Sequence, residues 1–322
     1  MTAFAKPDVT VIVCTRNRIA RVLDCLESVR RAAEATDAVV ELVVIDNGST
    51  DGTPAAVAAW AATRGDLAVR LLAESRPGAS HARNTGIRSA RGDLLIFTDD
   101  DCRLAADYIA VAVALARADA APTLRGGRVE LGDAKDLPFT VKLDDAREVF
   151  DGDANPGGFL LGCNMTLPRG AAALIGPFDP RFGPGAPFES ADDTEFLYRA
   201  HMAGVAVAYD PGLVVRHHHG RRDLSGLARL NHAYNIGNGA LYAKYAFSRP
   251  QLLRHFLWDV RDGVLELFGG ATFNAELGFS YRAKVWGNLI GALRYLRSAA
   301  ASIGRPSACV AGRNMDLGLP RP

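Results

Sequence analysis

Three consecutive aspartates, Asp99, Asp100 and Asp101, directly follow the apolar segment LLIFT. Adjacent carboxylates repel one another at neutral pH unless a cation or hydrogen bonds offset their charge. Mg²⁺ and Mn²⁺ prefer oxygen ligands and commonly bind one or two carboxylates together with a diphosphate. A helix cap is the plainer alternative, but capping requires only one aspartate. The run therefore predicts a site for Mn²⁺ or Mg²⁺.

Two other polar segments also begin where an apolar run ends. TRNR (15–18) comes after the run at 9–13, and DNGSTDGT (46–53) comes after the run at 41–45. Short apolar runs rich in β-branched residues are typical of strands that are covered on both faces. We therefore expect all three polar segments at the ends of buried strands.

The segments between these runs have helical periodicity. Apolar residues recur at three- and four-residue steps over 18–34. The other elements expected in this part are a helix at 54–64, a strand near 67–72, a helix after Gly78 and a strand at 94–98. Strands that alternate with helices predict right-handed βαβ units around a parallel sheet. Because ligands bind at the carboxyl ends of such strands, the three polar segments should converge on one cleft of an α/β fold.

The segment ESADDTEF supplies a second group of acids. Phe196 and Leu197 are spaced as the packing face of a helix that begins here, and acids in a first turn complement the helix dipole. Carboxylates at such a position can also act as general bases. Both interpretations remain open on the residues alone. The acids of this group are Glu189, Asp192, Asp193 and Glu195.

In their order and spacing, VIVCTRNR, VVIDNGSTDGT, RPGASHARNTGI and LLIFTDDD resemble the nucleotide-binding half of family 2 glycosyltransferases of the GT-A fold. The resemblance continues through GCNMTLPRGAAALIGPFDPRFG and DDTEFLYRAHMAG, so it covers roughly residues 8–220. It implies a Rossmann-like half with a mostly parallel central sheet flanked by helices. The implied reaction moves a sugar, with inversion, from a nucleotide diphosphate-sugar to a glycan or glycolipid acceptor. A UDP-sugar is the expected donor.

The resemblance also assigns roles to individual residues. Asp101 matches the metal ligand of the family's D-x-D element. The family register makes Asp193 the base that takes the acceptor proton, and Asp192 is its rival because it stands where Glu is commoner. Gly162 and Asn164 of GCNMT, together with Glu195, are assigned to donor or acceptor binding. The positions matched to nucleotide binding are Thr15, Asn17, Asp46, Arg83, Asp99 and Asp100.

Three histidines, at 217–219, follow the apolar run LVV and Arg216. In related enzymes a histidine after this strand completes the metal shell or contacts the diphosphate, and imidazole is a competent Mn²⁺ ligand. Alternate residues of a strand share a face, so His217 and His219 should lie on one side and His218 on the other. We assign His217 to the metal. The alternative is a solvated basic end of a strand.

The charge of the chain is divided between its two parts. The net charge is +1, but residues 1–215 hold 22 basic and 30 acidic side chains, and residues 216–322 hold 15 and 6. The near-neutral total argues against nucleic acid as a partner. Apolar stripes within 253–268 and 285–296, flanked by basic residues, predict helices that either contact an anionic membrane surface or pack against the catalytic part or a second subunit. Oligomeric state is not encoded in any pattern of the chain.

These patterns predict three regions. Residues 1–222 are the expected catalytic domain, 223–303 a C-terminal helical extension, and 304–322 a disordered tail. The five cysteines form no C-x-x-C pair, which favours reduced thiols over a zinc site or disulfide framework. With no signal-peptide pattern and no long apolar run, a cytoplasmic protein is expected, and a peripheral place on the inner face of the membrane is left open by the basic C-terminal helices.

Two other functions fit parts of the pattern. A sugar nucleotidyltransferase also places a nucleotide and a carboxylate-bound metal on an α/β sheet. Its usual glycine-rich triphosphate loop is missing, because TRNR contains no glycine. A non-catalytic module that binds nucleotide or sugar is the third reading, and the joint presence of Asp46, Asp101 and Asp193 argues against it.

Overall fold

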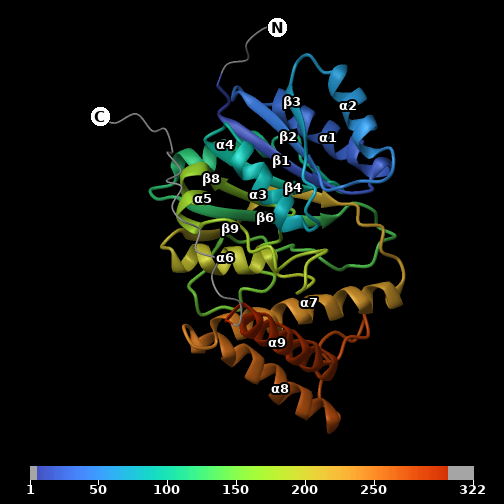
Figure 1. Cartoon of the computed structure of the whole chain (residues 1–322), viewed down its shortest axis with the longest axis vertical. Helices are drawn as coiled ribbons and strands as arrows, with labels where there is room; N and C mark the ends of the chain where they lie inside the picture. Colours follow the sequence, from blue (N-terminus) through green and yellow to red (C-terminus); the bar gives the residue numbers. More distant parts are fainter. Residues whose placement is uncertain (1–5, 304–322) are drawn as a thin grey trace.

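The computed structural model describes residues 6–303, which form an α/β body with a group of helices at one end (Figure 1). The predicted tail at 304–322 lies outside the described residues. The strands are β1 (Val9–Thr15), β2 (Val40–Asp46), β3 (Ala68–Ala73), β4 (Leu94–Asp99), β5 (Cys102–Leu104), β6 (Thr123–Leu131), β7 (Glu148–Val149), β8 (Met165–Pro168) and β9 (Ala206–His217). The helices are α1 (Ile19–Glu34), α2 (Thr53–Ala62), α3 (Ala79–Ser89), α4 (Tyr108–Ala118), α5 (Arg169–Ile175), α6 (Asp192–Met202), α7 (Leu224–Tyr245), α8 (Leu253–Leu267) and α9 (Tyr281–Ile303), with a 3₁₀ turn at Pro250–Leu252.

The first four strands of the sheet order are parallel, as the alternation of elements predicts. The order is β3-β2-β1-β4-β8-β6-β9-β5, and β7 pairs with β9. Thr15 of β1 stands opposite Asp46 of β2, and Cys14 stands opposite Asp99 of β4. The polar segments after β1, β2 and β4 therefore meet at one edge of the sheet, which confirms the expected convergence.

The other half of the sheet is mixed in direction. β8 runs antiparallel to β4 and β6, whereas β9 runs parallel to β6. β5 begins three residues after β4 ends and pairs antiparallel with β9, which places Cys102 opposite His217. This pairing explains why the aspartate run lies beside the histidines: the chain passes from β4 to the far edge of the sheet through Asp100 and Asp101.

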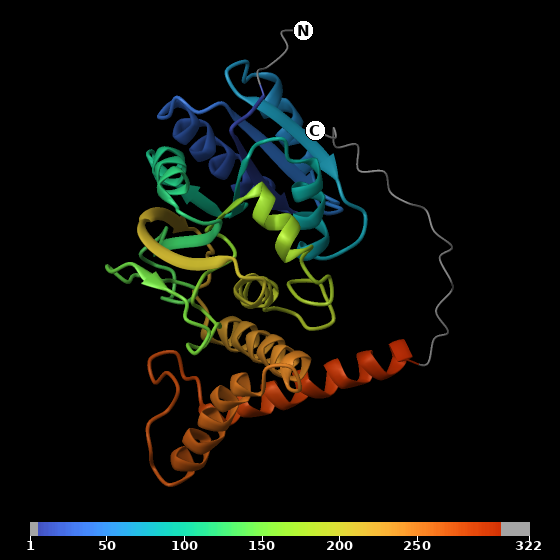
Figure 2. The same cartoon turned by 90° about the vertical axis from the view of Figure 1, so that its left-hand side faces the viewer.

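Helices cover both faces of the sheet, and each face has its own core. One core packs α1 and α4 against β1, β2 and β9 through side chains such as Val22, Leu26 and Ile109. The other packs α5, α6 and α7 against β4, β6 and β8. In this second core the rings of Phe178 and Phe196 stack with centroids 4.0 Å apart. Helix α6, which contributes to this second core, lies between the sheet and the C-terminal helices in both views (Figures 1 and 2).

The C-terminal helices are joined to the catalytic part by shared core residues. Leu241, Tyr242 and Tyr245 of α7 belong to the same apolar cluster as Phe97 and Phe196. The change of pattern at residue 222 therefore marks a change in secondary structure and not the edge of a separate core. α9 packs mainly on α7, and α8 packs on α9.

Candidate active site

Thr15, Asp99, Asp100 and Asp101 lie together at the carboxyl edge of β1 and β4. The Thr15 hydroxyl donates a hydrogen bond of 2.7 Å to Asp100 Oδ2. Burial raises the pKa of Asp100 to about 7, an effect that the Thr15 hydrogen bond opposes and the neighbouring Asp101 charge reinforces. Asp99 is more open to solvent than the other two acids. The charged form of Asp100 is thus disfavoured by its surroundings, chiefly by burial.

Asp46 and Asn17 shape the adjoining loops. Asp46 accepts the backbone N–H of Ser49 at 3.2 Å, and Asn17 Oδ1 accepts the backbone N–H of Thr50 at 2.7 Å. Asn17 has a φ of 55°, in the left-handed region that Asn tolerates better than most residues. These bonds hold the loop after β1 against the loop after β2, which brings both predicted nucleotide-contacting residues to the same edge.

Asp101 and His217 form a pair across the β5–β9 junction. His217 Nε2 lies 3.3 Å from Asp101 Oδ1. Burial alone would disfavour the charged forms of both His217 and Asp101, but their mutual hydrogen bond favours these forms more strongly. The hydrogen bond with Asp101 raises the pKa of His217 to about 9, and His217 lowers the pKa of Asp101 to about 2. The His217 and His219 rings lie together with centroids 5.1 Å apart, which agrees with the prediction that they share a face.

Arg83 connects the two acidic groups of the cleft. Its guanidinium contacts Asp99 Oδ1 at 3.2 Å through Nη2 and Asp192 Oδ2 through Nη1. Arg83 is buried, so its charge is held in place by these carboxylates and not by water. Arg83 thereby contacts both Asp99, at the end of β4, and Asp192, at the start of α6, although these acids are about a hundred positions apart in the sequence.

Asp192 and Asp193 are adjacent on α6 but differ in environment. Asp192 is 5% exposed, and burial raises its pKa to about 6 despite the Arg83 charge. Asp193 is only half-buried; its Oδ2 accepts the Gly162 backbone N–H at 2.8 Å and its Oδ1 accepts that of Thr194 at 2.7 Å. Asp193 is therefore fixed in orientation and remains partly exposed to solvent.

Asn164 is bound on all sides by the protein. It is fully buried, and its Oδ1 accepts the Tyr108 hydroxyl at 2.6 Å. Its amide nitrogen donates to the carbonyls of Arg128 and Leu213, each at 2.9 Å. The assignment of Asn164 to sugar binding is therefore corrected: it ties β6, α4 and β9 together behind the site. Gly162, in contrast, lies beside Arg83 and Asp193: a Cβ there would stand 3.2 Å from both Arg83 Nη2 and Asp193 Oδ2.

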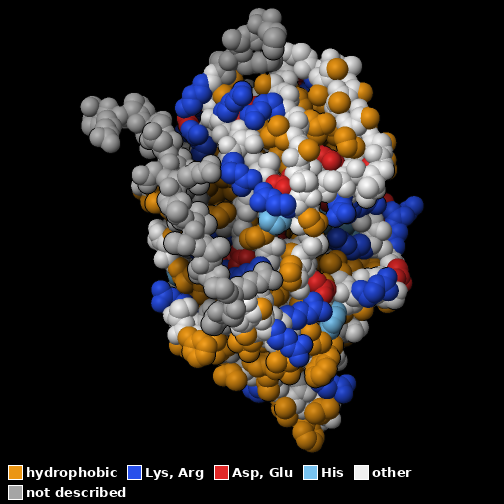
Figure 3. Space-filling view, in the orientation of Figure 1, with side chains coloured by type: hydrophobic (Ala, Val, Ile, Leu, Met, Phe, Trp, Pro, Cys, Tyr) orange, Lys and Arg blue, Asp and Glu red, His pale blue; other side chains and the backbone are white. Residues whose placement is uncertain are grey.

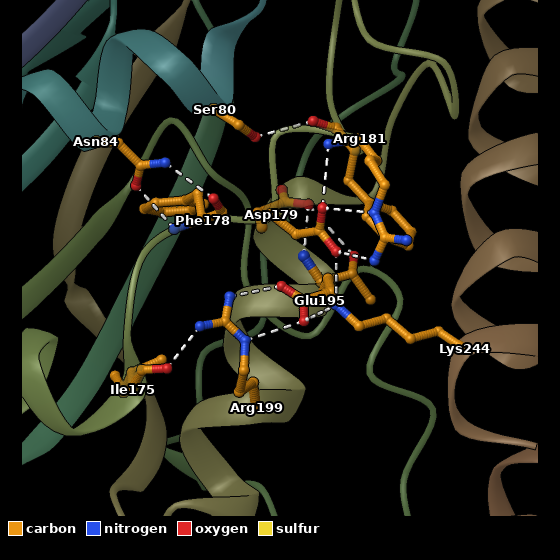
Figure 4. A network of polar contacts seen from close by, with 12 residues as sticks. Ser80, Asn84, Ile175, Phe178, Asp179, Arg181, Glu195, Arg199 and Lys244 are labelled. Atoms are coloured by element: carbon orange, nitrogen blue, oxygen red, sulfur yellow. Dashed lines mark hydrogen bonds and ion pairs between the residues drawn. The ribbon is translucent and has the colours of Figure 1, made fainter. Parts of the chain in front are cut away.

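Glu195 is also removed from the cleft. Its side chain is 0% exposed and points to the side of α6 that faces α7 (Figure 4). There it pairs with Arg199 at 2.7 Å and Lys244 at 2.8 Å, and it accepts the Tyr245 hydroxyl at 2.9 Å. At about 100° per residue, residue 195 lies roughly 200° around the helix from residue 193, so the Glu195 and Asp193 side chains point to opposite sides of α6. The assignment of Glu195 to donor or acceptor binding is therefore corrected to a structural role.

Two features of the site were not predicted. Arg18 of the TRNR segment approaches Asp100 at 3.7 Å and Asp101 at 3.8 Å, so it belongs to the charge balance of the aspartate run. Cys102, Cys163 and His217 bring one ligand atom each to within 4.8 Å of the others. Spacing rules could not find this group because its members come from three separate segments that only the sheet brings together.

The residues present fit a divalent ion. Asp101 and His217 offer a carboxylate oxygen and an imidazole nitrogen side by side, a donor set that Mn²⁺ accepts. The buried run around Asp100 would be stabilised by added positive charge. A separate pocket of about 650 Å³ is lined by Asp24, Arg103 and His218 among others. None of the predicted site residues lines this pocket.

The mostly parallel sheet with helices on both faces, and the carboxylates clustered at the ends of its strands, are those of an α/β protein of the GT-A type. Residues 10–135 match the model for glycosyl transferase family 2. Over this segment, which is less than half of the chain, the sequence is similar to glycosyl transferase family 2, as the motifs implied.

Relatives and solved structures agree with this assignment. The succinoglycan biosynthesis protein ExoM of Rhizobium meliloti is 27% identical over 260 residues, which are 78% of this chain and 80% of ExoM. Glycosyltransferase AglE of Haloferax volcanii is 33% identical over 96 residues, which are 30% of this chain and 31% of AglE. The chain thus matches only about a third of AglE, and it matches a similar share of ExoO of Rhizobium meliloti.

Among solved structures, the mannosyltransferase PcManGT from Pyrobaculum calidifontis, in complex with GDP-Man and Mn²⁺, superimposes with a TM-score of 0.52 and 25% identity. The superposition covers 96% of this chain and 77% of that one. TarS 1-349 of S. aureus, in complex with UDP-GlcNAc, gives a TM-score of 0.51 at 15% identity, over 91% of this chain and 92% of that one. The second likeness supports the fold alone.

Proposed function

We propose that this protein is an inverting glycosyltransferase that moves a sugar from a nucleotide diphosphate-sugar to a hydroxyl of a glycan or lipid-linked acceptor. The observation that carries the proposal is the meeting, at Arg83, of the acids that follow β4 and the acids that open α6. The acids after β4 lie where α/β sheets bind nucleotides, and the acids of α6 lie on the other side of Arg83. Inverting transfer requires a base on the side of the sugar opposite the leaving nucleotide, and this arrangement supplies one.

In the proposed reaction, Asp193 removes the proton of the acceptor hydroxyl. The acceptor oxygen forms a bond to the anomeric carbon while the bond from that carbon to the diphosphate oxygen breaks, and the electron pair leaves with the nucleoside diphosphate. Attack on the face opposite the leaving group inverts the anomeric centre. The Gly162 and Thr194 N–H groups orient Asp193, and Asp192 holds Arg83.

The nucleotide side of the cleft is built by Thr15, Asn17, Asp46, Asp99 and Asp100. Carboxylates such as Asp46 and Asp99 suit ribose hydroxyls, which are good donors. Asp101 and His217 would hold the metal, which supplies charge to stabilise the departing diphosphate. Mn²⁺ and Mg²⁺ both meet the chemistry of this donor set. We expect a UDP-linked donor.

Two variants test the division of roles. We expect Asp193→Asn to lower kcat by roughly 10²- to 10⁴-fold, the usual contribution of a general base, while nucleotide affinity is unchanged. We expect Asp101→Ala to lose both transfer and the metal-dependent part of nucleotide binding, because its carboxylate is a proposed ligand. Transfer is measured as release of nucleoside diphosphate, and binding by calorimetry with and without Mn²⁺.

Asp37→Asn is the matched control, because Asp37 is an exposed aspartate between α1 and β2, outside the cleft. It should change neither quantity. Full activity of Asp193→Asn would refute the assignment of the base, and Asp192→Asn would then be tested in its place. Release of pyrophosphate, in contrast, would identify a nucleotidyltransferase. A thermal-shift screen of UDP-, GDP- and dTDP-sugars with Mn²⁺ would identify the donor.

A further inference from the structure

Helix α8 packs Leu253 and Phe256 toward the core and carries a second group of apolar side chains on the face that points away from the protein. Leu257, Trp258, Val264 and Leu265 are exposed on it, and Phe268, directly after its end, is 84% exposed. Its buried positions are instead His255, Asp259 and Gly263. A surface helix of a globular protein normally shows the opposite arrangement, with its apolar stripe turned to the core. Helix α8 therefore presents apolar side chains where a surface helix in water would present polar ones.

Helix α9 also presents apolar side chains on its solvent-facing side. Trp286, Leu289, Leu293 and Leu296 are exposed and spaced three and four residues apart, so they form one stripe, in which Trp286 is 63% exposed. We call these four residues, with the exposed residues of α8 named above, the outer apolar face. Figure 3 shows hydrophobic side chains gathered over this end of the molecule, with Lys and Arg side chains along the border.

The contact of α9 with the rest of the protein depends on glycine and polar groups. A Cβ at Gly291 would overlap the carbonyl oxygen of Ile236 on α7, so the two backbones approach closely. Between α8 and α9, Lys284 Nζ bonds to Asp259 Oδ1 at 2.8 Å. Close packing through glycine and buried polar pairs is the mode by which helices associate when their outer surfaces face lipid.

The charges around the outer apolar face have one prevailing sign. Residues 246–303 contain seven basic and four acidic side chains. Asp259 and Glu266 are turned inward, with side-chain exposures of 9% and 4%, whereas Arg261 and Arg282 are 65% and 59% exposed. Arg261 and Arg282 are thus exposed beside the outer apolar face, although each also pairs with an acid, Asp262 and Glu266 respectively.

We infer that the outer apolar face lies in the interface of an anionic membrane, with the exposed arginines at the headgroups. Exposed Trp and Leu beside basic residues are the pattern of helices that bind in the plane of such an interface. No helix in the part of the chain that the structure describes is long and apolar enough to cross a membrane, so the contact is with one leaflet. A second copy of the chain is less suited, because pairing this face with itself would bring arginine rims together.

Flotation of the full chain with phosphatidylcholine vesicles, with and without phosphatidylglycerol, tests the inference. We expect binding to the phosphatidylglycerol vesicles that weakens as salt is added. The double variant Trp258→Ser/Trp286→Ser should bind at least about tenfold more weakly, because each Trp removes a large apolar area from water on docking. Leu174→Ser is the matched control: Leu174 is 65% exposed on α5, outside the outer apolar face, and its variant should float like the unchanged chain.

Circular dichroism verifies that each variant is folded, and light scattering without vesicles gives its oligomeric state. Absence of flotation with both vesicles would overturn the inference, as would equal flotation of the double variant. A dimer that the double variant dissociates, without any vesicle binding, would assign the face to a second copy instead. Because flotation requires no turnover, its failure is distinct from failure of the proposed transfer reaction.

Discussion

Asp192 and Asp193 show how one position along a helix decides the chemistry of a carboxylate. Asp192 is buried against Arg83, whereas Asp193 is bound by two backbone N–H groups and remains reachable. A base must reach the acceptor proton, so accessibility favours Asp193. Asp192 then acts as a positioning residue for Arg83. This difference in burial supports the choice that the sequence motif alone left between two neighbours.

Glu195 is expected to contribute stability and not catalysis. Replacing it by Gln removes the charge that faces Arg199 and Lys244, and breaking such a buried pair costs about 3 kcal/mol of unfolding free energy. Despite burial, which raises it, the pKa of Glu195 is lowered overall by the Arg199 hydrogen bond and the charges of Arg199 and Lys244. A carboxylate with a lowered pKa stabilises the fold above its unfolded pKa and loses that contribution as pH falls through its folded pKa.

The stability difference between the unchanged chain and Glu195→Gln should therefore be largest at neutral pH and shrink in acid, below about pH 4. Urea unfolding at a series of pH values measures it. Glu276→Gln, at an exposed position between α8 and α9, is the control and should leave stability nearly unchanged. A difference that is the same at neutral and acid pH would show that the Glu195 charge is not its cause.

The sequence predicted that the residues at the strand ends lie together. Thr15, Asp46 and Asp99 meet because each closes a buried parallel strand, a position that is visible in the pattern of apolar runs, and their part in nucleotide binding stays a prediction. Asn164 and Glu195 were assigned wrongly because their side chains point to other elements, and a linear pattern does not show which face of a segment meets which neighbour. The Tyr108–Asn164 and Glu195–Lys244 contacts join residues about fifty positions apart.

At the scale of elements, the contact between α7 and α9 depends on the absence of side chains. A Cβ at Gly291 would overlap a backbone oxygen of α7, and backbone cannot move aside as a side chain can. We expect Gly291→Ala to lower the unfolding free energy by about 1–3 kcal/mol, the usual cost of overpacking, even though Ala favours a helix. Thermal and urea unfolding measure this change.

Gly263→Ala on α8 provides the comparison. A Cβ there would meet its nearest atoms at 3.6–3.7 Å, which is ordinary contact. Without a clash, the lower flexibility of Ala in the unfolded chain should raise stability by about 0.5–1 kcal/mol. Stabilisation by both substitutions would mean that α7 and α9 are not as close as described.

Most element boundaries of the nucleotide-binding half follow from the sequence, and those of the second half follow less well. The predicted strand at 94–98 and helix at 18–34 agree with β4 and α1 to within one residue. The pairing of β5 with β9 was not predicted, because three residues after a strand carry no periodicity of their own. In α8 and α9 the apolar stripes were predicted, but the direction in which they face was not, since periodicity does not distinguish inward from outward.

At the scale of the whole molecule, the catalytic part and α7 form one body. Tyr242 and Tyr245 complete an apolar cluster that also contains Phe97 and Phe196, so a chain ended after residue 222 would expose this cluster to water. We expect such a chain to lose cooperative thermal unfolding, whereas a chain ended after residue 303 should keep it. Near-UV circular dichroism and calorimetry make the comparison. A cooperative transition in the shorter chain would show that residues 1–222 fold alone.

The guanidinium of Arg83 has a kinetic consequence for the proposed enzyme. One positive charge serves both Asp99, on the nucleotide side, and Asp192, beside the proposed base. If the diphosphate of a bound donor attracts the Arg83 guanidinium, the electrostatic surroundings of Asp192 and Asp193 change before the acceptor binds. By linkage, the acceptor must in turn change the affinity for the donor by the same factor. The two substrates would then bind in a preferred order, because binding of the first changes the affinity for the second.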